Sequence, residues 1–134
     1  MGRRVLWVLL VVLLGFIWGH SLQNGTASQA ESQSVLHLAL ARWGSLPGMG
    51  YLNFYTIRKL AHLTEFTALG MVLTGLTGRG LPALLLGAAA GAVDECLQLF
   101  SGPQCPGVGC AAGYLGVFVG ILAVQLLCRL WEEK

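Results

Sequence analysis

Long stretches without charge constrain this chain more than any other feature. Asp, Glu, Lys and Arg are all absent between Val5 and Ala30, between Arg79 and Asp94, and between Glu95 and Arg129. A transmembrane helix needs about 20 mostly apolar residues, so these gaps are long enough to cross a bilayer. Only 10% of the 134 residues are charged, against about 25% in soluble domains. The chain is therefore expected to be an all-α integral membrane protein, because lipid offers the backbone no hydrogen-bonding partners.

Four apolar segments divide the chain, which we expect to form one domain over 1–134 with a bundle of about four transmembrane helices. The spans are expected at 5–19, 57–77, 81–100 and 108–131, with an outer loop at 20–56. The first segment, with its basic start and the later "TASQA", is also similar to a secretory signal cleaved after Ala30. The distance from Gly19 to that site is long for a signal, which favours a retained helix.

The positive residues predict the orientation, since cytoplasmic loops of membrane proteins are enriched in Lys and Arg. With four spans, five cations fall on one side and three on the other. The five are Arg3, Arg4, Arg79, Arg129 and Lys134, and the three are Arg42, Arg58 and Lys59. We therefore expect a multi-pass protein of the cell membrane with both termini in the cytoplasm.

The outer segment has two parts of different composition. "QNGTASQAESQS" is polar and typical of a loop, and "VLHLALARWGSL" is partly apolar. The second part fits either a short amphipathic helix on the membrane surface or an ordered loop. Beyond it, Cys105 and Cys110 can form a disulfide if their loop lies outside, and Cys96 and Cys128 are expected to be apolar fillers.

Small residues at four-residue spacing predict close helix packing. Gly87 and Gly91 form such a stripe on the third span, together with Asp94. The second span is the expected neighbour of that stripe. On the fourth span, two further ladders predict a contact face: Gly109 with Gly113, and Ala112 with Gly116 and Gly120.

Two polar stretches interrupt the apolar spans, "IRKLAHLTEF" and "DECLQ". Helical spacing puts Arg58, His62 and Glu65 on one face of the second span. Asp94 and Gln98 share a stripe on the third, with Glu95 about 100° away. At 1.5 Å per residue, Glu65 lies about 12 Å from the outer end of its helix and Asp94 about 9 Å from the outer end of its own. The two sets are therefore expected at similar depth in the outer half of the membrane.

Ionised groups at such depth are costly, and they normally pair and mark function. Three interpretations stay open. The residues can be a buried ion network that sets helix register, with Arg58 and Lys59 reaching the interface. They can supply a general acid and base, for which the candidate catalytic residues are His62, Glu65, Asp94 and Glu95. Arg58 and Lys59 can also attract a phosphate or carboxylate head group.

Metals, cofactors and nucleic-acid partners are not expected. One His with three carboxylates is a thin metal-ligand set, and its His–Glu order is the reverse of the bundle motif. No metal and no cofactor are therefore predicted. The net charge is only +2 without a basic stripe, so no nucleic-acid partner is predicted either.

The order of "GHSLQN", "RKLAHLTEFTALG" and "AVDECLQLF" resembles the VanZ-like family, small bacterial membrane proteins associated with resistance to the glycopeptide teicoplanin. The resemblance covers nearly the whole chain. It implies that the polar positions of both motifs are binding residues, namely Arg58, Lys59, His62, Glu65, Asp94, Glu95 and Gln98. It also implies a serine/glutamine motif at Ser21 and Gln23.

The chain departs from the family pattern after its third span. Gln104 stands where the family has Arg, and Gly109 and Gly113 stand where it has Asp. The absent charges weaken the expectation of an enzyme that acts on a lipid head group. The leading expectation is a protein that binds or shields an outer-face group, with membrane lipid, a lipid-linked cell-wall precursor or a glycopeptide as partner. A purely structural helix-packing module is the remaining alternative.

Overall fold

A computed structural model describes residues 2–22, 25–100 and 109–133, and these contain only helices and their connections. The elements are α1 (Arg3–Leu22), α2 (Gly25–Trp43), the short 3-10 helix η1 (Met49–Tyr51), α3 (Phe54–Thr77), α4 (Gly80–Phe100) and α5 (Gly109–Glu132). The four expected spans correspond to α1, α3, α4 and α5, whose bounds differ from the predicted ones by a few residues. The all-α fold is confirmed.

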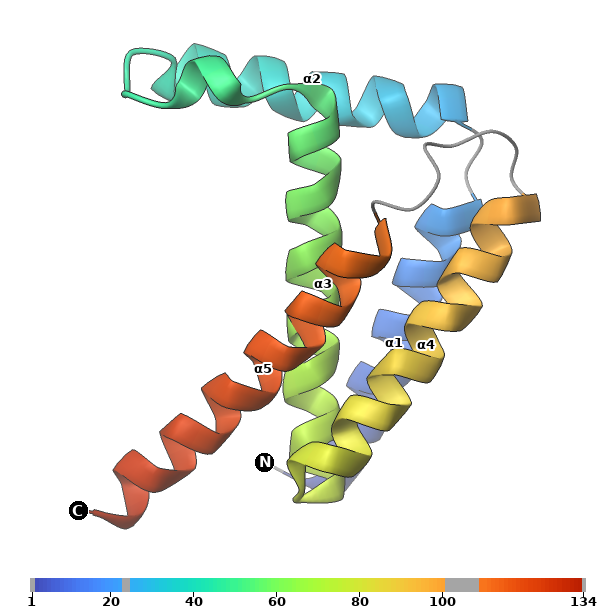
Figure 1. The fold of residues 1–134 in the computed structure, drawn as a ribbon, viewed down its shortest axis with the longest axis vertical. Helices are drawn as coiled ribbons and strands as arrows, with labels where there is room; N and C mark the ends of the chain where they lie inside the picture. The colour runs from blue at the N-terminus through green and yellow to red at the C-terminus, as the bar shows by residue number, and fades with distance from the viewer. Residues whose placement is uncertain (1, 23–24, 101–108, 134) are drawn as a thin grey trace.

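The helix α3 is the centre of the bundle, because it contacts each of the other four α-helices. Figure 1 shows α1, α3, α4 and α5 running along the bundle, while α2 lies crosswise at one end. The two termini lie at the opposite end. The fully buried core lies between the long helices and includes Ile17 of α1, Phe66 and Leu69 of α3, and Val117 of α5.

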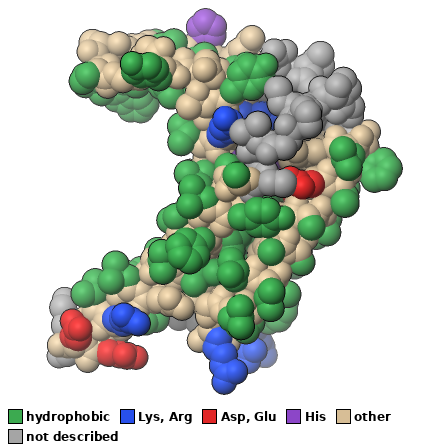
Figure 2. Space-filling view, viewed as in Figure 1, with side chains coloured by type: hydrophobic (Ala, Val, Ile, Leu, Met, Phe, Trp, Pro, Cys, Tyr) green, Lys and Arg blue, Asp and Glu red, His purple; other side chains and the backbone are tan. Residues whose placement is uncertain are grey.

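The surface of the bundle is suited to lipid. Three helices, α1, α4 and the Ala111–Glu132 part of α5, are long and apolar enough to cross a membrane. Large apolar side chains cover their outer faces, with Val11 68%, Leu85 63% and Leu126 59% exposed, and such side chains spread along the bundle in Figure 2. The polar first half of α3 explains why α3 is not among the three helices that are apolar enough to cross a membrane.

The helix α1 is part of the core. Ile17 is fully buried, and the Trp18 indole lies 3.5 Å from the Ala90 carbonyl oxygen on α4. Cleavage after Ala30 would remove these contacts. Retention of this helix stays a prediction.

The prediction of a polar loop after α1 is wrong, because α2 begins at Gly25 and includes most of that segment. Its Ala, Ser, Gln and Glu residues are tolerated in helices, and composition alone does not separate a polar surface helix from a loop. Ser34 also donates a hydrogen bond of 2.9 Å to the Ala30 carbonyl. A capping box then begins α3, in which the Asn53 side chain accepts from the Thr56 amide at 3.0 Å.

The contact face predicted on the fourth span is confirmed, and its partner is α3. A Cβ placed on Gly116 would lie 2.6 Å from the Leu63 carbonyl oxygen, and one on Gly120 would collide with the Thr67 carbonyl. In the opposite direction, Gly70 of α3 packs on the Val117 backbone. The two backbones therefore touch, as small residues allow in membrane helices. The surroundings of Gly109 lie outside the described residues.

The neighbour predicted for the glycine stripe of α4 is corrected. A Cβ on Gly87 would meet the Val117 side chain of α5, and Gly91 faces Tyr114 of α5 as well as Phe66 of α3. The two glycines thus pack largely on α5, and the predicted contact with α3 is made at Gly91 and at Asp94. Spacing defines the face of a helix but not which neighbour covers it.

We predict that Gly120→Ala destabilises the bundle by about 1–3 kcal/mol, because an added methyl group forces the α3 and α5 backbones apart. The matched control is Gly15→Ala, since no atom lies within 4 Å of a Cβ at Gly15. Its stability should be unchanged or rise by up to about 1 kcal/mol, from helix propensity. Unfolding by SDS titration in mixed micelles measures both, and equal effects would contradict the packing described.

Candidate functional site

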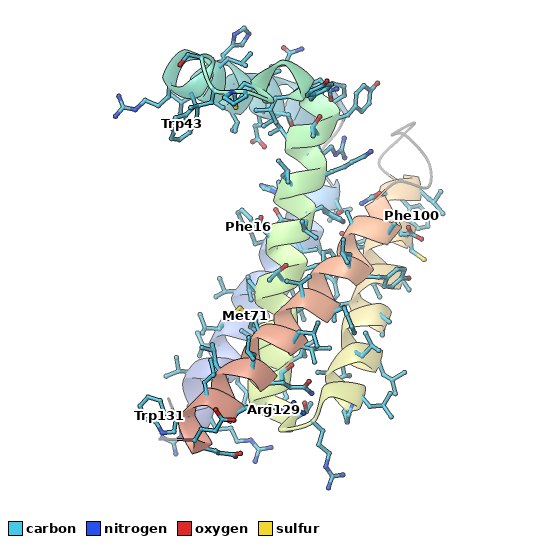
Figure 3. The ribbon with its side chains drawn as sticks, turned by 60° about the vertical axis from the view of Figure 1, so that its left-hand side comes forward. Phe16, Trp43, Met71, Phe100, Arg129 and Trp131 are labelled. Atoms are coloured by element: carbon cyan, nitrogen blue, oxygen red, sulfur yellow. The ribbon has the colours of Figure 1, made fainter. Side chains whose placement is uncertain are left out.

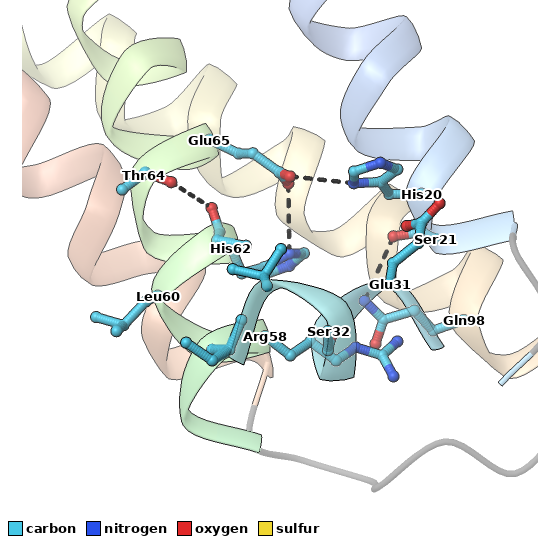
Figure 4. Close-up of a pocket in the computed structure, with 13 residues that line it drawn as sticks. His20, Ser21, Glu31, Ser32, Arg58, Leu60, His62, Thr64, Glu65 and Gln98 are labelled. Carbon is cyan, nitrogen blue, oxygen red and sulfur yellow. Dashed lines mark hydrogen bonds and ion pairs between the residues drawn. The ribbon is translucent and has the colours of Figure 1, made fainter. Parts of the chain in front are cut away.

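Polar side chains from α1, α3 and α4 meet at the end of the bundle next to α2 (Figure 4). We call them the polar cluster. It consists of His20 and Ser21 on α1, His62 and Glu65 on α3, and Asp94 and Gln98 on α4. The i, i+3 spacing on α3 and the i, i+4 spacing on α4 each place two of these side chains on one helix face.

His62 lies between two carboxylates. Its Nε2 atom is 3.0 Å from Asp94 Oδ2, and its Nδ1 atom is 3.7 Å from Glu65 Oε2. The imidazole therefore links α3 to α4, and its ring also lies against Phe66, with 4.9 Å between the ring centres. These contacts restrict the ring orientation.

The end of α1 supplies two further contacts. His20 Nδ1 lies 3.2 Å from Glu65 Oε1, and the Ser21 hydroxyl donates a short hydrogen bond to Asp94 Oδ1. His20 is 40% exposed, whereas Glu65 is only 10% exposed. A continuous chain of alternating imidazole and carboxylate groups thus runs from the surface of α1 to the buried side chain of Asp94.

Asp94 is 1% exposed and is the most deeply buried acid in the described part of the chain. Its Oδ2 atom accepts from Gln98 Nε2 at 2.8 Å and faces His62, while Oδ1 accepts from Ser21. Both oxygens are therefore satisfied, which a buried carboxylate requires. Within residues 2–22, 25–100 and 109–133, every buried polar side-chain atom whose surroundings are described has a partner.

A cavity of about 390 Å³ adjoins the polar cluster, bounded by α1, α2, α3 and α4. Its polar lining comprises His20, Ser21, Glu31, Ser32, Arg58, His62, Thr64, Glu65 and Gln98. Its apolar lining comprises Val35, Ile57, Leu60 and Ala61. The helix α2 forms one wall through Glu31, Ser32 and Val35.

The structure brings most of the candidate site residues together. Five of them belong to the polar cluster, namely Ser21, His62, Glu65, Asp94 and Gln98, and Arg58 lines the cavity. Lys59 and Glu95 do not line it, as the helical spacing of Glu95 indicated. Cys96 and Cys128 are exposed free cysteines, and Gln23, Gln104, Cys105 and the side chain of Cys110 lie outside the described residues.

Three residues of the site were missed by the sequence analysis. His20 was not predicted as a site residue, although its place directly before Ser21 was the available signal. Glu31 and Ser32 were missed because their segment was expected to be a loop. Helix α2 is what brings them to the cavity wall.

The geometry permits proton exchange but differs from a hydrolase triad. In a Ser-His-Asp triad the imidazole faces the hydroxyl, whereas here the carboxylate of Asp94 lies between Ser21 and His62. Ser21 is thus a donor to a buried acid. Among the residues searched in the described ranges, no group of three His, Cys, Asp or Glu has metal-ligand geometry.

The fold and the polar cluster define a small helical membrane protein with an ionisable site at one end of its bundle. A family model described as VanZ/LLP1 matches residues 6–129, so the chain belongs to the VanZ-like family. The resemblance noted in the sequence is confirmed. No curated protein and no solved structure matches the chain.

We predict that Asp94→Asn destabilises the protein by about 1.5–3 kcal/mol, because it removes the charge that three neighbouring groups stabilise. Glu95→Gln makes the same chemical change one residue along α4, outside the cavity lining, and should alter stability by less than about 0.5 kcal/mol. SDS titration of both variants measures the difference. Equal destabilisation by the two changes would show that the contacts of Asp94 contribute no more to stability than those of Glu95.

Proposed function

We propose that this VanZ-like membrane protein lowers susceptibility to glycopeptides such as teicoplanin. It does so by binding or shielding a lipid-linked or cell-wall group at the outer face of a bacterial cell membrane. The observation that carries the proposal is the cavity beside the polar cluster, where buried ionisable groups adjoin an open space. Ionisable groups within a membrane bundle mark binding or transport sites by default.

The proposal includes an orientation in which both termini are cytoplasmic and the cavity is outside. The distribution of cations supports it. Arg3, Arg4, Arg79 and Arg129 belong to the end of the bundle that carries the termini, opposite α2 (Figures 1 and 3). Cytoplasmic ends of membrane helices are enriched in such residues.

We predict that expression of the protein in a sensitive Gram-positive host raises the teicoplanin concentration that inhibits growth. Glu65→Gln should abolish the rise, because Glu65 faces both histidines of the polar cluster. Glu132→Gln, an equivalent change in an exposed residue at the far end of α5, should preserve it. Growth inhibition by teicoplanin and vancomycin is measured with the membrane level of each variant quantified.

Two outcomes of that experiment contradict the proposal. Unchanged teicoplanin tolerance in cells that contain the wild-type protein would exclude a role in susceptibility. If Glu65→Gln abolishes tolerance only because the variant does not fold, the structural alternative is favoured. In that alternative, the polar cluster serves to hold three helices together. A folded variant without tolerance excludes that alternative.

A second candidate function is an intramembrane enzyme that acts on a lipid head group. The position of His62 between Glu65 and Asp94 favours it, because such a histidine can exchange a proton with a bound group. This function predicts head-group turnover in membranes that contain the protein, reduced at least 100-fold in Glu65→Gln, about the contribution of one general acid or base. Mass spectrometry of extracted lipids measures the turnover, and equal turnover in the variant excludes this role for Glu65.

A further inference from the structure

The cavity has two chemically distinct parts. Val35, Ile57, Leu60 and Ala61 contribute apolar lining, and the remaining residues contribute hydroxyl, amide, imidazole, guanidinium and carboxylate groups. A soluble polar solute would leave the apolar part uncovered. A molecule that is polar at one end and apolar at the other fits both parts, because it gains apolar burial as well as hydrogen bonds.

The donors of the cavity favour a phosphate at the polar end. Arg58, Ser32 and Gln98 all line it, and Figure 4 shows them at the same end of the cavity, away from Glu65. Arginine presents five N–H donors in a fork that matches phosphate oxygens, so it can serve a neighbouring residue and a phosphate together. Ser32 adds a hydroxyl donor from the opposite wall, on α2.

The carboxylates of the cavity oppose a free anion. Glu31 and Glu65 also line it, so an inorganic phosphate ion would meet repulsion without any gain from the apolar part. A lipid phosphate meets the same repulsion but also buries its chain against Val35 and Leu60. The lining therefore discriminates in favour of an anion attached to a hydrocarbon chain.

The position of α2 brings the cavity to the depth of lipid head groups. α2 lies across the end of a bundle in which three helices are long and apolar enough to cross a membrane. It exposes the apolar side chains of Leu38 and Trp43, 71% and 54%. Figure 3 shows Trp43 near the end of α2 that projects away from the long helices. An apolar residue and a tryptophan at this level are typical of the membrane–water interface. The cavity wall formed by α2 thus lies where membrane phosphates are concentrated.

We propose that the cavity binds a phosphate-bearing membrane lipid, with the phosphate at Arg58 and Ser32 and the first part of the chain along Val35, Leu60 and Ala61. This inference rests on the proposed function, because it concerns the same cavity, and it names the ligand class as lipid rather than a glycopeptide or a cell-wall peptide.

The test is native mass spectrometry of the full chain in detergent micelles with added dioleoylphosphatidate. We expect one bound lipid per chain at low lipid concentration. Dioleoylglycerol, which lacks the phosphate, should bind at least about tenfold more weakly, the loss expected when one charge-assisted hydrogen bond is missing. Inorganic phosphate should not displace the lipid.

Adjacent residues supply matched variants. Arg58→Gln should weaken phosphatidate binding by about tenfold or more, whereas Lys59→Gln, which removes the same charge from a residue outside the cavity lining, should leave it within about twofold. Val35→Asp and Leu38→Asp form a second pair on α2, in which only the first residue lines the cavity. Size-exclusion elution and circular dichroism establish that each variant is folded.

Each contrary result has a definite meaning. Equal losses in Arg58→Gln and Lys59→Gln would show nonspecific attraction and overturn the proposal. Equal binding of dioleoylglycerol would overturn the phosphate site, and displacement by inorganic phosphate would show a site for the free ion. If phosphatidate does not bind but the protein still raises teicoplanin tolerance, the proposed function stands with another ligand. If phosphatidate binds but tolerance does not rise, the proposed function is contradicted and the lipid site stands.

Discussion

The carboxylate of Asp94 is the group on which the rest of this site depends. An acid with 1% exposure inside a membrane bundle is stable only when its oxygens have donors. The groups that face these oxygens come from three helices: Ser21 on α1 and Gln98 on α4 donate hydrogen bonds, and His62 Nε2 on α3 lies 3.0 Å from Oδ2. These contacts tie α1, α3 and α4 to one another, and the cavity adjoins them.

Close backbone packing is the second constraint, and it acts on the other side of α3. Gly116 and Gly120 let α5 approach the α3 backbone, which leaves the opposite face of α3 for α1 and the polar cluster. α3 thus has an apolar, glycine-dependent contact with α5 and a polar contact with α1 and α4. This division explains how a helix with charged residues lies at the centre of the bundle.

The sequence predicted the parts of this structure that follow from composition and helical period. Charge-free gaps located the long helices, and spacing placed His62 with Glu65, Asp94 with Gln98, and Glu95 apart. It did not predict His20 in the cluster, because the rotation of α1 depends on contacts with distant residues. The extent of α2 was missed because polar residues fit both a surface helix and a loop. Periodicity likewise did not show that Gly87 packs on α5.

The structure shows what surrounds Gly113, one of the positions at which the chain departs from the family pattern. A Cβ at Gly113 would lie 3.6 Å from the Phe66 ring, and Phe66 in turn contacts the His62 ring. Where the resemblance implies an acid, this chain therefore has an apolar contact beneath the histidine. The polar cluster is nevertheless satisfied without that acid, since His62 has Glu65 and Asp94 as partners.

The ties between α1 and the later helices also bear on how the protein is made. α1 carries no charge beyond its first two residues and can enter the bilayer unaided as soon as it is synthesised. α3 carries Arg58, Lys59 and Glu65 and enters lipid at a cost that only its neighbours offset. In the chain, His20 precedes Glu65 and Asp94 follows it. The groups that contact the polar side chains of α3 therefore lie on one helix made before α3 and on one made after it.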